Sequence, residues 1–266
     1  MFADAYDIAR EFTKPVVISV RKQDGTVQSS MAAFVVLNQE GWFATAAHVL
    51  NPFFAARQQA DEIAAHKQDP GGEEPNPEWI TNQSFWWGWD GMSMAEVHVR
   101  AESDLAIGRL EPFESKIVKT FPTVVDEGHL RPGTSLLRLG FPFHALQATF
   151  SGNQFHLPEG ALPAPLFPIE GIYTRQIRVE GSILPRFIET TSPGLLGQSG
   201  GPVVDVDGRL WGIQSRTHHL NLGFSPRVKK GDEVVEEHQF LNVGIAVHPN
   251  EILDLCDEKG VRVARG

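Results

Sequence analysis

The chain has 266 residues, 41% of them hydrophobic and 21% charged, and its 33 acidic side chains exceed its 23 Lys and Arg, giving a net charge of −10. This length suffices for one large or two small domains whose core needs no disulfide bonds. Nucleic acid and anionic membranes bind clustered basic side chains, and the sequence has no basic block, so we expect neither partner. The longest apolar run, residues 32–37, is far too short to span a membrane.

The first segment has the periodicity of a helix, and most of the chain after it has that of short strands. Apolar residues recur at helical spacing from Phe2 to Phe12, which predicts an amphipathic helix that ends before Pro15. Residues 52–68 also have a helical composition, with Pro52 suited to a first turn. Strand-like runs precede this helix at residues 15–22, 30–38 and 42–50.

A segment rich in proline and glycine, residues 111–134, separates two halves that both consist of strand-like runs. The chain closes with a helical stretch, for which Asn250 is expected as N-cap and Gly260 as the stop. Many short strands, with helices only at the ends and in one insertion, predict a β-barrel or β-sandwich architecture.

One serine stands among three glycines and a proline at residues 197–202, directly before a predicted hairpin. Apolar runs flank the dipeptide Asp207-Gly208, which is typical of a hairpin turn. Ser199 is therefore expected on a tight loop where backbone N–H groups can point at one spot. The Gly-x-Ser-x-Gly elbow of α/β-hydrolases fits the same residues, but it requires a helix after the serine, and Pro202 begins a strand instead.

A histidine and an aspartate upstream have the surroundings that a serine nucleophile needs. His48 ends an apolar strand beside small alanine residues. Asp104 precedes the apolar run at residues 105–107, so its carboxylate should be half-buried and need a hydrogen-bond donor, which a histidine N–H would supply. The order His48, Asp104, Ser199 is the order found in chymotrypsin-type proteases.

Three segments resemble the signature blocks of trypsin-like, chymotrypsin-fold serine proteases: TAAHVL, SDLAIGRL and GQSGGPVVDVDGRLWGI. Residues 187–204 and 242–252 further resemble the bacterial HtrA-type branch. The resemblance implies an all-β fold of two antiparallel six-stranded β-barrels, with short N- and C-terminal helices and a helical insertion near residues 52–68. It implies a first barrel within residues 1–115, carrying the histidine and the aspartate, and a second within residues 116–266, carrying the serine.

The resemblance implies a serine endopeptidase that forms an acyl-enzyme on Ser199 and acts on a protein or peptide substrate. His48 would be the general base and acid, Asp104 would orient it, and the backbone N–H groups of Gly197 and Ser199 would form the oxyanion hole. Digestive members pair an acid before the nucleophile with a newly cut N-terminus; here Gln198 is neutral, so we expect no propeptide cleavage. The alternative is a chymotrypsin-fold protein that binds or scaffolds without cleaving, and the complete set of site residues favours the enzyme.

The resemblance also implies where the substrate side chain binds. Pro193 takes the place of the acid that a trypsin-like enzyme uses for Lys or Arg, so a basic side chain would lack its partner. Gly244 and Ala246 leave room beside the apolar surface of Leu196 and Ile245, so we expect small to medium apolar side chains instead. A basic rim of Arg216, His218 and His219 leaves Glu or Asp as the alternative. The expected substrate-binding residues are Pro193, Leu196, Ser215, Arg216, Thr217, Gly244 and Ala246.

No cofactor and no metal ion are expected, because the pair His218-His219 has no third ligand at a recognisable spacing. The sequence has one cysteine, Cys256, and no recognisable export signal or PDZ domain, so we expect a cytoplasmic protein. The tryptophans of the insertion at residues 52–100, Trp79, Trp86, Trp87 and Trp89, are expected to pack in the core or at the barrel rim, and a substrate-binding lip is the alternative. The sequence leaves the oligomeric state undetermined.

Overall fold

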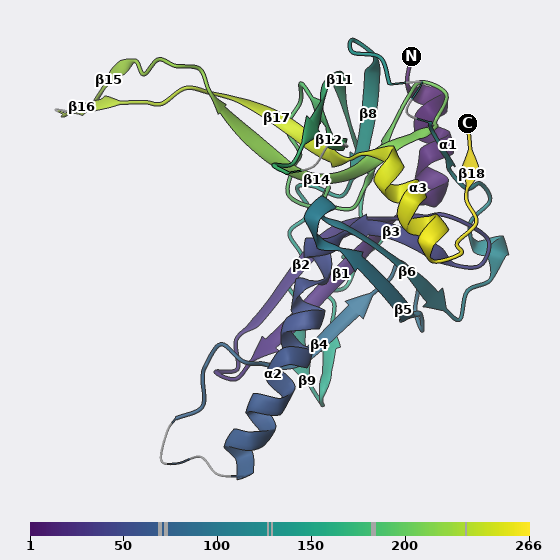
Figure 1. The fold of residues 1–266 in the computed structure, drawn as a ribbon. Coiled ribbons are helices and arrows are strands. Elements are labelled where there is room, and N and C mark those ends of the chain that lie inside the picture. Colours follow the sequence, from purple (N-terminus) through teal and green to yellow (C-terminus); the bar gives the residue numbers. More distant parts are fainter. Residues whose placement is uncertain (69–70, 72–73, 127, 129, 182–184, 232) are drawn as a thin grey trace.

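The computed structural model of the protein describes residues 1–68, 71, 74–126, 128, 130–181, 185–231 and 233–266. Two antiparallel β-sheet units lie against each other, with helices at their margins (Figure 1). The expected all-β architecture of two barrel-like units is confirmed. The helices of the described part are α1 (Ala3–Phe12), α2 (Asn51–Gln68) and α3 (Pro249–Glu258), with short 3₁₀ turns η1 (Ala47–Leu50), η2 (Ala101–Ser103) and η3 (Ser115–Ile117).

The first unit is a six-stranded sheet with the order β4-β1-β2-β3-β6-β5. Its central strand β3 is buried along its whole length, and the second half of β2 is buried too. Within the described residues, the end strands β4 and β5 do not pair with each other, so this unit is a half-open barrel. The strands are β1 (Thr13–Lys22), β2 (Val27–Val36), β3 (Trp42–Ala46), β4 (Ile80–Trp86), β5 (Ser93–Arg100) and β6 (Leu105–Glu111).

The second unit is a closed ring with the order β13-β8-β11-β12-β17-β14, in which β13 also pairs with β14. Two short strands, β7 (Thr123–Val124) and β18 (Ala264–Arg265), extend it in parallel beside β14. The domain boundary expected near residue 115 stays a prediction. The ring strands are β8 (Ser135–Gly140), β11 (Phe167–Arg178), β12 (Pro185–Thr190), β13 (Pro202–Val204), β14 (Leu210–Asn221) and β17 (Phe240–Val247).

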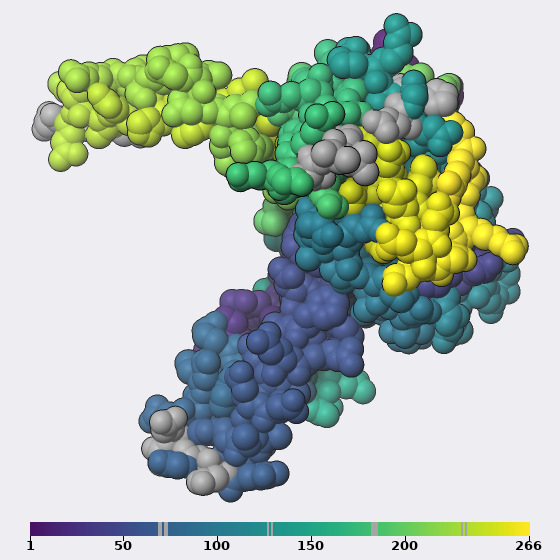
Figure 2. Space-filling view, in the orientation of Figure 1, coloured from purple at the N-terminus to yellow at the C-terminus, as the bar shows by residue number. Residues whose placement is uncertain are grey.

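Two projections leave the body of the molecule (Figure 2). One is α2, which has no buried residue and packs beside β4. The other is the continuation of β14 and β17, which ends in the hairpin of β15 (Arg227–Lys230) and β16 (Glu233–Glu236). A smaller hairpin joins β9 (Thr149–Ser151) to β10 (Gln154–His156).

The two units share one hydrophobic core. Phe34 and Phe43 of the first unit belong to the same buried cluster as Leu139 and Val247 of the second. Trp87 lies in this cluster and packs edge-on against Phe34, so it occupies the expected core position, whereas Trp79, Trp86 and Trp89 are only partly buried. Because the core is continuous, side chains at the junction of the units are held in fixed relative positions.

The C-terminal helix α3 also fastens the two units together. Its buried Glu251 forms ion pairs with Arg100 at the end of β5, at 3.2 Å, and with Arg186 in β12, at 3.1 Å. The helix begins earlier than expected: His248, not Asn250, is the N-cap, and its Nδ1 accepts a hydrogen bond from the Asn250 N–H at 3.2 Å. Proline at the first helical position suits this start, since its missing N–H needs no partner.

No helix in the described part of the chain is long and apolar enough to cross a membrane.

Candidate active site

His48 lies in the 3₁₀ turn η1, immediately after the buried strand β3. Its backbone N–H donates to Asp104 Oδ1 at 2.9 Å, and the preceding Ala47 N–H donates to the Asp104 carbonyl at 2.9 Å. The two segments are therefore joined by main-chain hydrogen bonds before the imidazole ring makes any contact. The ring stays partly open to solvent, with 41% of the side chain exposed.

Asp104 follows the turn η2 and adopts a left-handed backbone conformation, with φ of 53°. This conformation is uncommon for a residue with a side chain. It is held here because the Asp104 N–H donates to Ala101 and its carbonyl accepts from Ala47. The carboxylate that results is only 15% exposed and points at the His48 ring.

The structure brings His48, Asp104 and Ser199 into one chain of hydrogen bonds. His48 Nδ1 lies 2.8 Å from Asp104 Oδ2 and 3.1 Å from Oδ1, and His48 Nε2 lies 2.9 Å from Ser199 Oγ. All three distances are within hydrogen-bonding range. The histidine ring thus connects a carboxylate of the first unit to a serine hydroxyl of the second.

A fourth residue, Ser215 in β14, completes the surroundings of the carboxylate. The pairing of β14 with β17 passes from Gln214↔Ala246 to Arg216↔Ile245, so Ser215 is the extra residue of a β-bulge. A bulge re-aims a side chain, and the Ser215 hydroxyl donates to Asp104 Oδ2 at 2.5 Å. Burial raises the pKa of Asp104, but the hydrogen bonds from His48 and Ser215 outweigh it and leave the pKa below the ordinary value.

The loop before Ser199 contains a tight turn that depends on glycine. Gly197 has a φ of +95°, and the Gln198 N–H donates back to the Leu195 carbonyl at 2.9 Å. A Cβ on Gly197 would overlap the carbonyl of Phe141, whose own N–H donates to the Gly197 carbonyl at 2.9 Å. The buried Gln198 side chain also accepts from the Leu195 N–H at 3.0 Å, which fixes the turn from inside.

The loop is anchored to both units. The Ser199 carbonyl accepts from the Ala33 N–H in β2 at 2.8 Å, and the Gly200 N–H donates to the Gln214 carbonyl in β14 at 2.8 Å. Within the described residues, the N–H groups of Gly197 and Ser199 donate to no acceptor. The loop that carries Ser199 therefore has two backbone donors without an acceptor among the described residues, as an oxyanion hole requires.

A cavity of about 600 Å³ opens over these groups and is lined by His48, Asp104 and Ser199. Four of the expected substrate-binding residues line it as well: Leu196, Ser215, Arg216 and Thr217. Pro193, Gly244 and Ala246 are not among its lining residues. The other lining residues are Gly194 and Leu195, which lie in the loop leading to Ser199, and two residues that the sequence did not point to, Ala101 and Gln214.

Arg138, a residue that the sequence analysis did not single out, fills the space beside Gly244. A Cβ on Gly244 would overlap Arg138 Nη1. The guanidinium donates to Gln214 Oε1 at 3.2 Å, to Ser192 Oγ at 3.0 Å and to the Ser192 carbonyl. The available signal was a charged residue inside the apolar run Leu136-Leu137-Arg138-Leu139. The room expected beside Gly244 for a substrate side chain is therefore occupied by Arg138.

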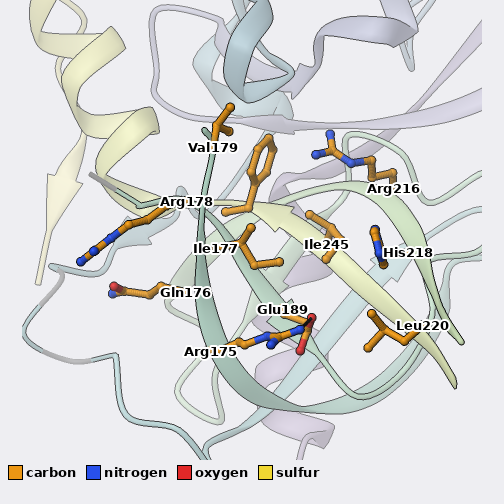
Figure 3. A pocket seen from close by; sticks show the side chains of 11 residues that line it. Arg175, Gln176, Ile177, Arg178, Val179, Glu189, Arg216, His218, Leu220 and Ile245 are labelled. Atoms are coloured by element: carbon orange, nitrogen blue, oxygen red, sulfur yellow. Dashed lines mark hydrogen bonds and ion pairs between the residues drawn. The ribbon is translucent and has the colours of Figure 1, made fainter. Parts of the chain in front are cut away.

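A second cavity, of about 490 Å³, adjoins the first, because Arg216 lines both. Figure 3 shows its apolar floor, including Ile177 and Ile245, with Arg178 and Arg216 at its rim. The Arg216 guanidinium lies over the Phe187 ring, 4.5 Å from its centroid. Arg178 and Arg216 form no ion pair within the described residues, so basic side chains extend from this cavity to the first.

Across the described residues, no group of three or more His, Cys, Asp or Glu side chains is arranged to hold a metal ion. Cys256 is buried, and burial raises the pKa of its thiol to about 12, so it is not a reactive thiolate at neutral pH.

Two β-barrel units with a Ser–His–Asp hydrogen-bond chain at their junction define the chymotrypsin-like class of fold. A family model described as trypsin-like peptidase domain matches residues 32–213. The chain therefore belongs to the trypsin-like peptidase domain family. No match was found among curated proteins.

Solved structures of proteases share this fold at low sequence identity. The Rv3671c protease from M. tuberculosis in its active form is 14% identical with a TM-score of 0.53, over 100% of this chain and 87% of that one. The HtrA-type protease AlgW with a tripeptide is 16% identical with a TM-score of 0.51, over 98% of this chain and 65% of that one. AlgW with a decapeptide is 16% identical with a TM-score of 0.55, over 97% of this chain and 67% of that one. This chain thus spans less than two thirds of the AlgW chain in the tripeptide complex.

Proposed function

We propose that the protein is a serine endopeptidase with Ser199 as nucleophile. The observation that carries the proposal is the position of His48, hydrogen-bonded through one ring nitrogen to Asp104 and through the other to Ser199. A serine hydroxyl is a weak nucleophile until an adjacent base takes its proton, and a histidine is an effective base only when its ring is held in one orientation.

The reaction would proceed through an acyl-enzyme. His48 Nε2 accepts the Ser199 proton while Oγ attacks the peptide carbonyl carbon, and the resulting oxyanion accepts hydrogen bonds from the Gly197 and Ser199 N–H groups. His48 then gives the proton to the leaving amine as the C–N bond breaks. A water molecule, deprotonated by the same nitrogen, attacks the ester, and the peptide acid leaves as the proton returns to Ser199.

The edge of β14 supplies a place for an extended substrate. Beyond Gln214, β14 pairs with β17 on one side, while its pairing with β13 on the other side ends at Ile213. A peptide can add to such a free edge as a further strand, which brings its carbonyl to the serine. The AlgW structures, which contain a tripeptide or a decapeptide, support a peptide substrate for this fold.

A fluorophosphonate probe, combined with cleavage of an unfolded protein, tests the proposal. We expect the probe to label Ser199, and both labelling and cleavage to be lost in Ser199→Ala and His48→Ala, by roughly 10⁴- to 10⁶-fold in turnover. The control variant is Ser151→Ala, an exposed serine in β9 that should leave both unchanged. A folded protein that is neither labelled nor active would favour the alternative, a binding or scaffold protein.

A further inference from the structure

Arg138 is a buried cation with no carboxylate partner in the described part of the chain. Its side chain is 1% exposed, and its three acceptors are the neutral oxygens of Ser192 and Gln214. Buried charges in proteins are normally paired with an opposite charge, because removal from water costs several kcal/mol. Three partly buried arginines obey this rule: Arg100 and Arg186 pair with Glu251, and Arg209 pairs with Asp205.

The charge on Arg138 persists at neutral pH. Burial lowers the pKa of its guanidinium to about 10, which is still well above 7. The carboxylates on neighbouring strands do not neutralise it, because Glu170 of β11 is exposed and Glu189 of β12 is bound by Arg175 and Thr174. An uncompensated positive charge therefore remains in the interior of the second barrel.

This charge lies directly behind the cavity that contains Ser199. Gln214 lines that cavity, accepts a hydrogen bond from Arg138 at 3.2 Å and donates through Nε2 to the Arg216 carbonyl at 3.1 Å. Two glycines leave space for the Arg138 guanidinium and its partner Ser192. A Cβ on Gly244 would overlap Arg138, and a Cβ on Gly171 would overlap Ser192. The barrel thus makes room for a guanidinium, with a single amide side chain between it and the cavity.

A substrate carboxylate would complete this arrangement. An acidic side chain that enters between Gly194 and Thr217 would replace two contacts: the Thr217 hydroxyl donates to the Gly194 carbonyl at 2.6 Å, and Gln214 Oε1 accepts from Arg138 at 3.2 Å. Its carboxylate would then accept from the guanidinium, whose planar donors match a carboxylate. A lysine or arginine side chain would meet a like charge. An apolar side chain would leave the cation unpaired.

We propose that Arg138 makes the primary subsite selective for an acidic side chain, so that the protein cleaves after Glu or Asp. This inference rests on the proposed endopeptidase function. It replaces the apolar preference expected from Pro193 and Gly244, and it assigns the selectivity to a residue inside the barrel and not to the rim residue Arg216.

Binding to the inactive variant Ser199→Ala tests the inference without turnover. Two peptides that differ only in Glu or Gln at the residue preceding the bond to be cut are compared, and we expect the Glu peptide to bind roughly 100-fold more tightly. Adding Arg138→Met should bring the ratio near one, while Arg138→Lys, which keeps a charge, should retain part of it. Both peptides are measured on the same preparation of each variant. Any unfolded protein therefore lowers the two apparent affinities equally and cancels in their ratio.

Two control variants remove a charge nearby. Arg178→Met, at the rim of the second cavity, should leave the Glu-to-Gln ratio unchanged. The inference would be overturned if the Glu and Gln peptides bound equally to the protein with Arg138 intact. It would also be overturned if the Glu-to-Gln ratio were lost in Arg216→Met but kept in Arg138→Met.

Cleavage of a peptide library separates failure of this inference from failure of the proposed function. Dominant cleavage after Glu and Asp supports the inference. Dominant cleavage after apolar or basic residues contradicts it and leaves the endopeptidase function standing. If no peptide is cut and Ser199 is not labelled, the proposed function fails, and the binding ratio still decides whether Arg138 selects a carboxylate.

Discussion

Ser215 donates a 2.5 Å hydrogen bond to Asp104, across the junction between the two β-sheet units. Asp104 belongs to the first unit and Ser215 to a bulge in the second, so the carboxylate that contacts His48 is held from both sides. Its lowered pKa depends on the way the two units pack.

Removal of this hydrogen bond should weaken the site without destroying it. A hydrogen bond to a charged group is worth about 1.5–3 kcal/mol, so Ser215→Ala should lower kcat by roughly tenfold and raise the pKa of Asp104. The carboxyl pKa can be followed by NMR titration and kcat with a peptide substrate. An unchanged Asp104 pKa in Ser215→Ala would show that the hydroxyl does not stabilise the carboxylate.

The lowered pKa of Asp104 also predicts a pH dependence of stability. A depressed pKa in the folded state gives stability that is present above the unfolded value, about 3.9, and is lost as the pH falls through the folded value. The difference in unfolding free energy between the unaltered protein and Asp104→Asn should therefore be constant near neutrality and shrink in acid. Urea denaturation at several pH values measures it, and a difference that grows in acid would contradict the prediction.

The turn at Gly197 predicts a loss of activity from one added methyl group. Gly197→Ala places a Cβ against the Phe141 carbonyl at a φ of +95°, so the turn must change and displace the N–H groups that we propose as oxyanion donors. We expect kcat to fall by roughly 10²- to 10³-fold. Gly25→Ala is the matched control, because Gly25 has a similar φ of +87° but an added Cβ would meet only Arg21 Nη2, at an ordinary contact distance of 3.9 Å. A similar loss in both variants would argue against a specific role for the Gly197 turn.

The ion-pair cluster of Glu251 predicts a structural coupling between the units. Glu251→Gln leaves Arg186 without its near partner and should cost about 3 kcal/mol of unfolding free energy, because the carboxylate is only 8% exposed. Glu258→Gln, which removes the other partner of Arg100 at a site 57% exposed, should cost less than about 1 kcal/mol. Thermal or urea unfolding distinguishes these outcomes, and equal effects would mean that Glu251 does not fasten the units.

Arg138 predicts a wide pH range for the preference for acidic substrates. The Glu-to-Gln binding ratio should stay constant between about pH 6 and 9, fall below about pH 4.3 as the substrate carboxyl gains its proton, and fall near pH 10 as Arg138 loses its own. A ratio that drops between pH 6 and 8 would contradict the role of Arg138.

The fold class and the residues that meet in the site were predictable because their signals are local. His48 and Asp104 each adjoin a buried apolar strand, and Ser199 lies among glycines that a tight loop requires. Strand periodicity fixed the all-β class, and an apolar face predicted α1, whose Ala5, Ala9 and Phe12 are buried. The order of the three site residues then indicated their meeting point at the junction of two barrels.

Tertiary packing decided what surrounds them. Arg138 and Gly244 lie far apart in the sequence and meet only because β8 and β17 belong to one closed ring, so no local pattern could reveal that a guanidinium fills the expected room. Ser215 reaches Asp104 because a bulge shifts the register of β14, and a register shift depends on the partner strand. Local sequence thus determined which groups could carry the chemistry. Long-range strand pairing determined which charges and cavities they face, because burial and hydrogen-bond partners exist only in the assembled barrels.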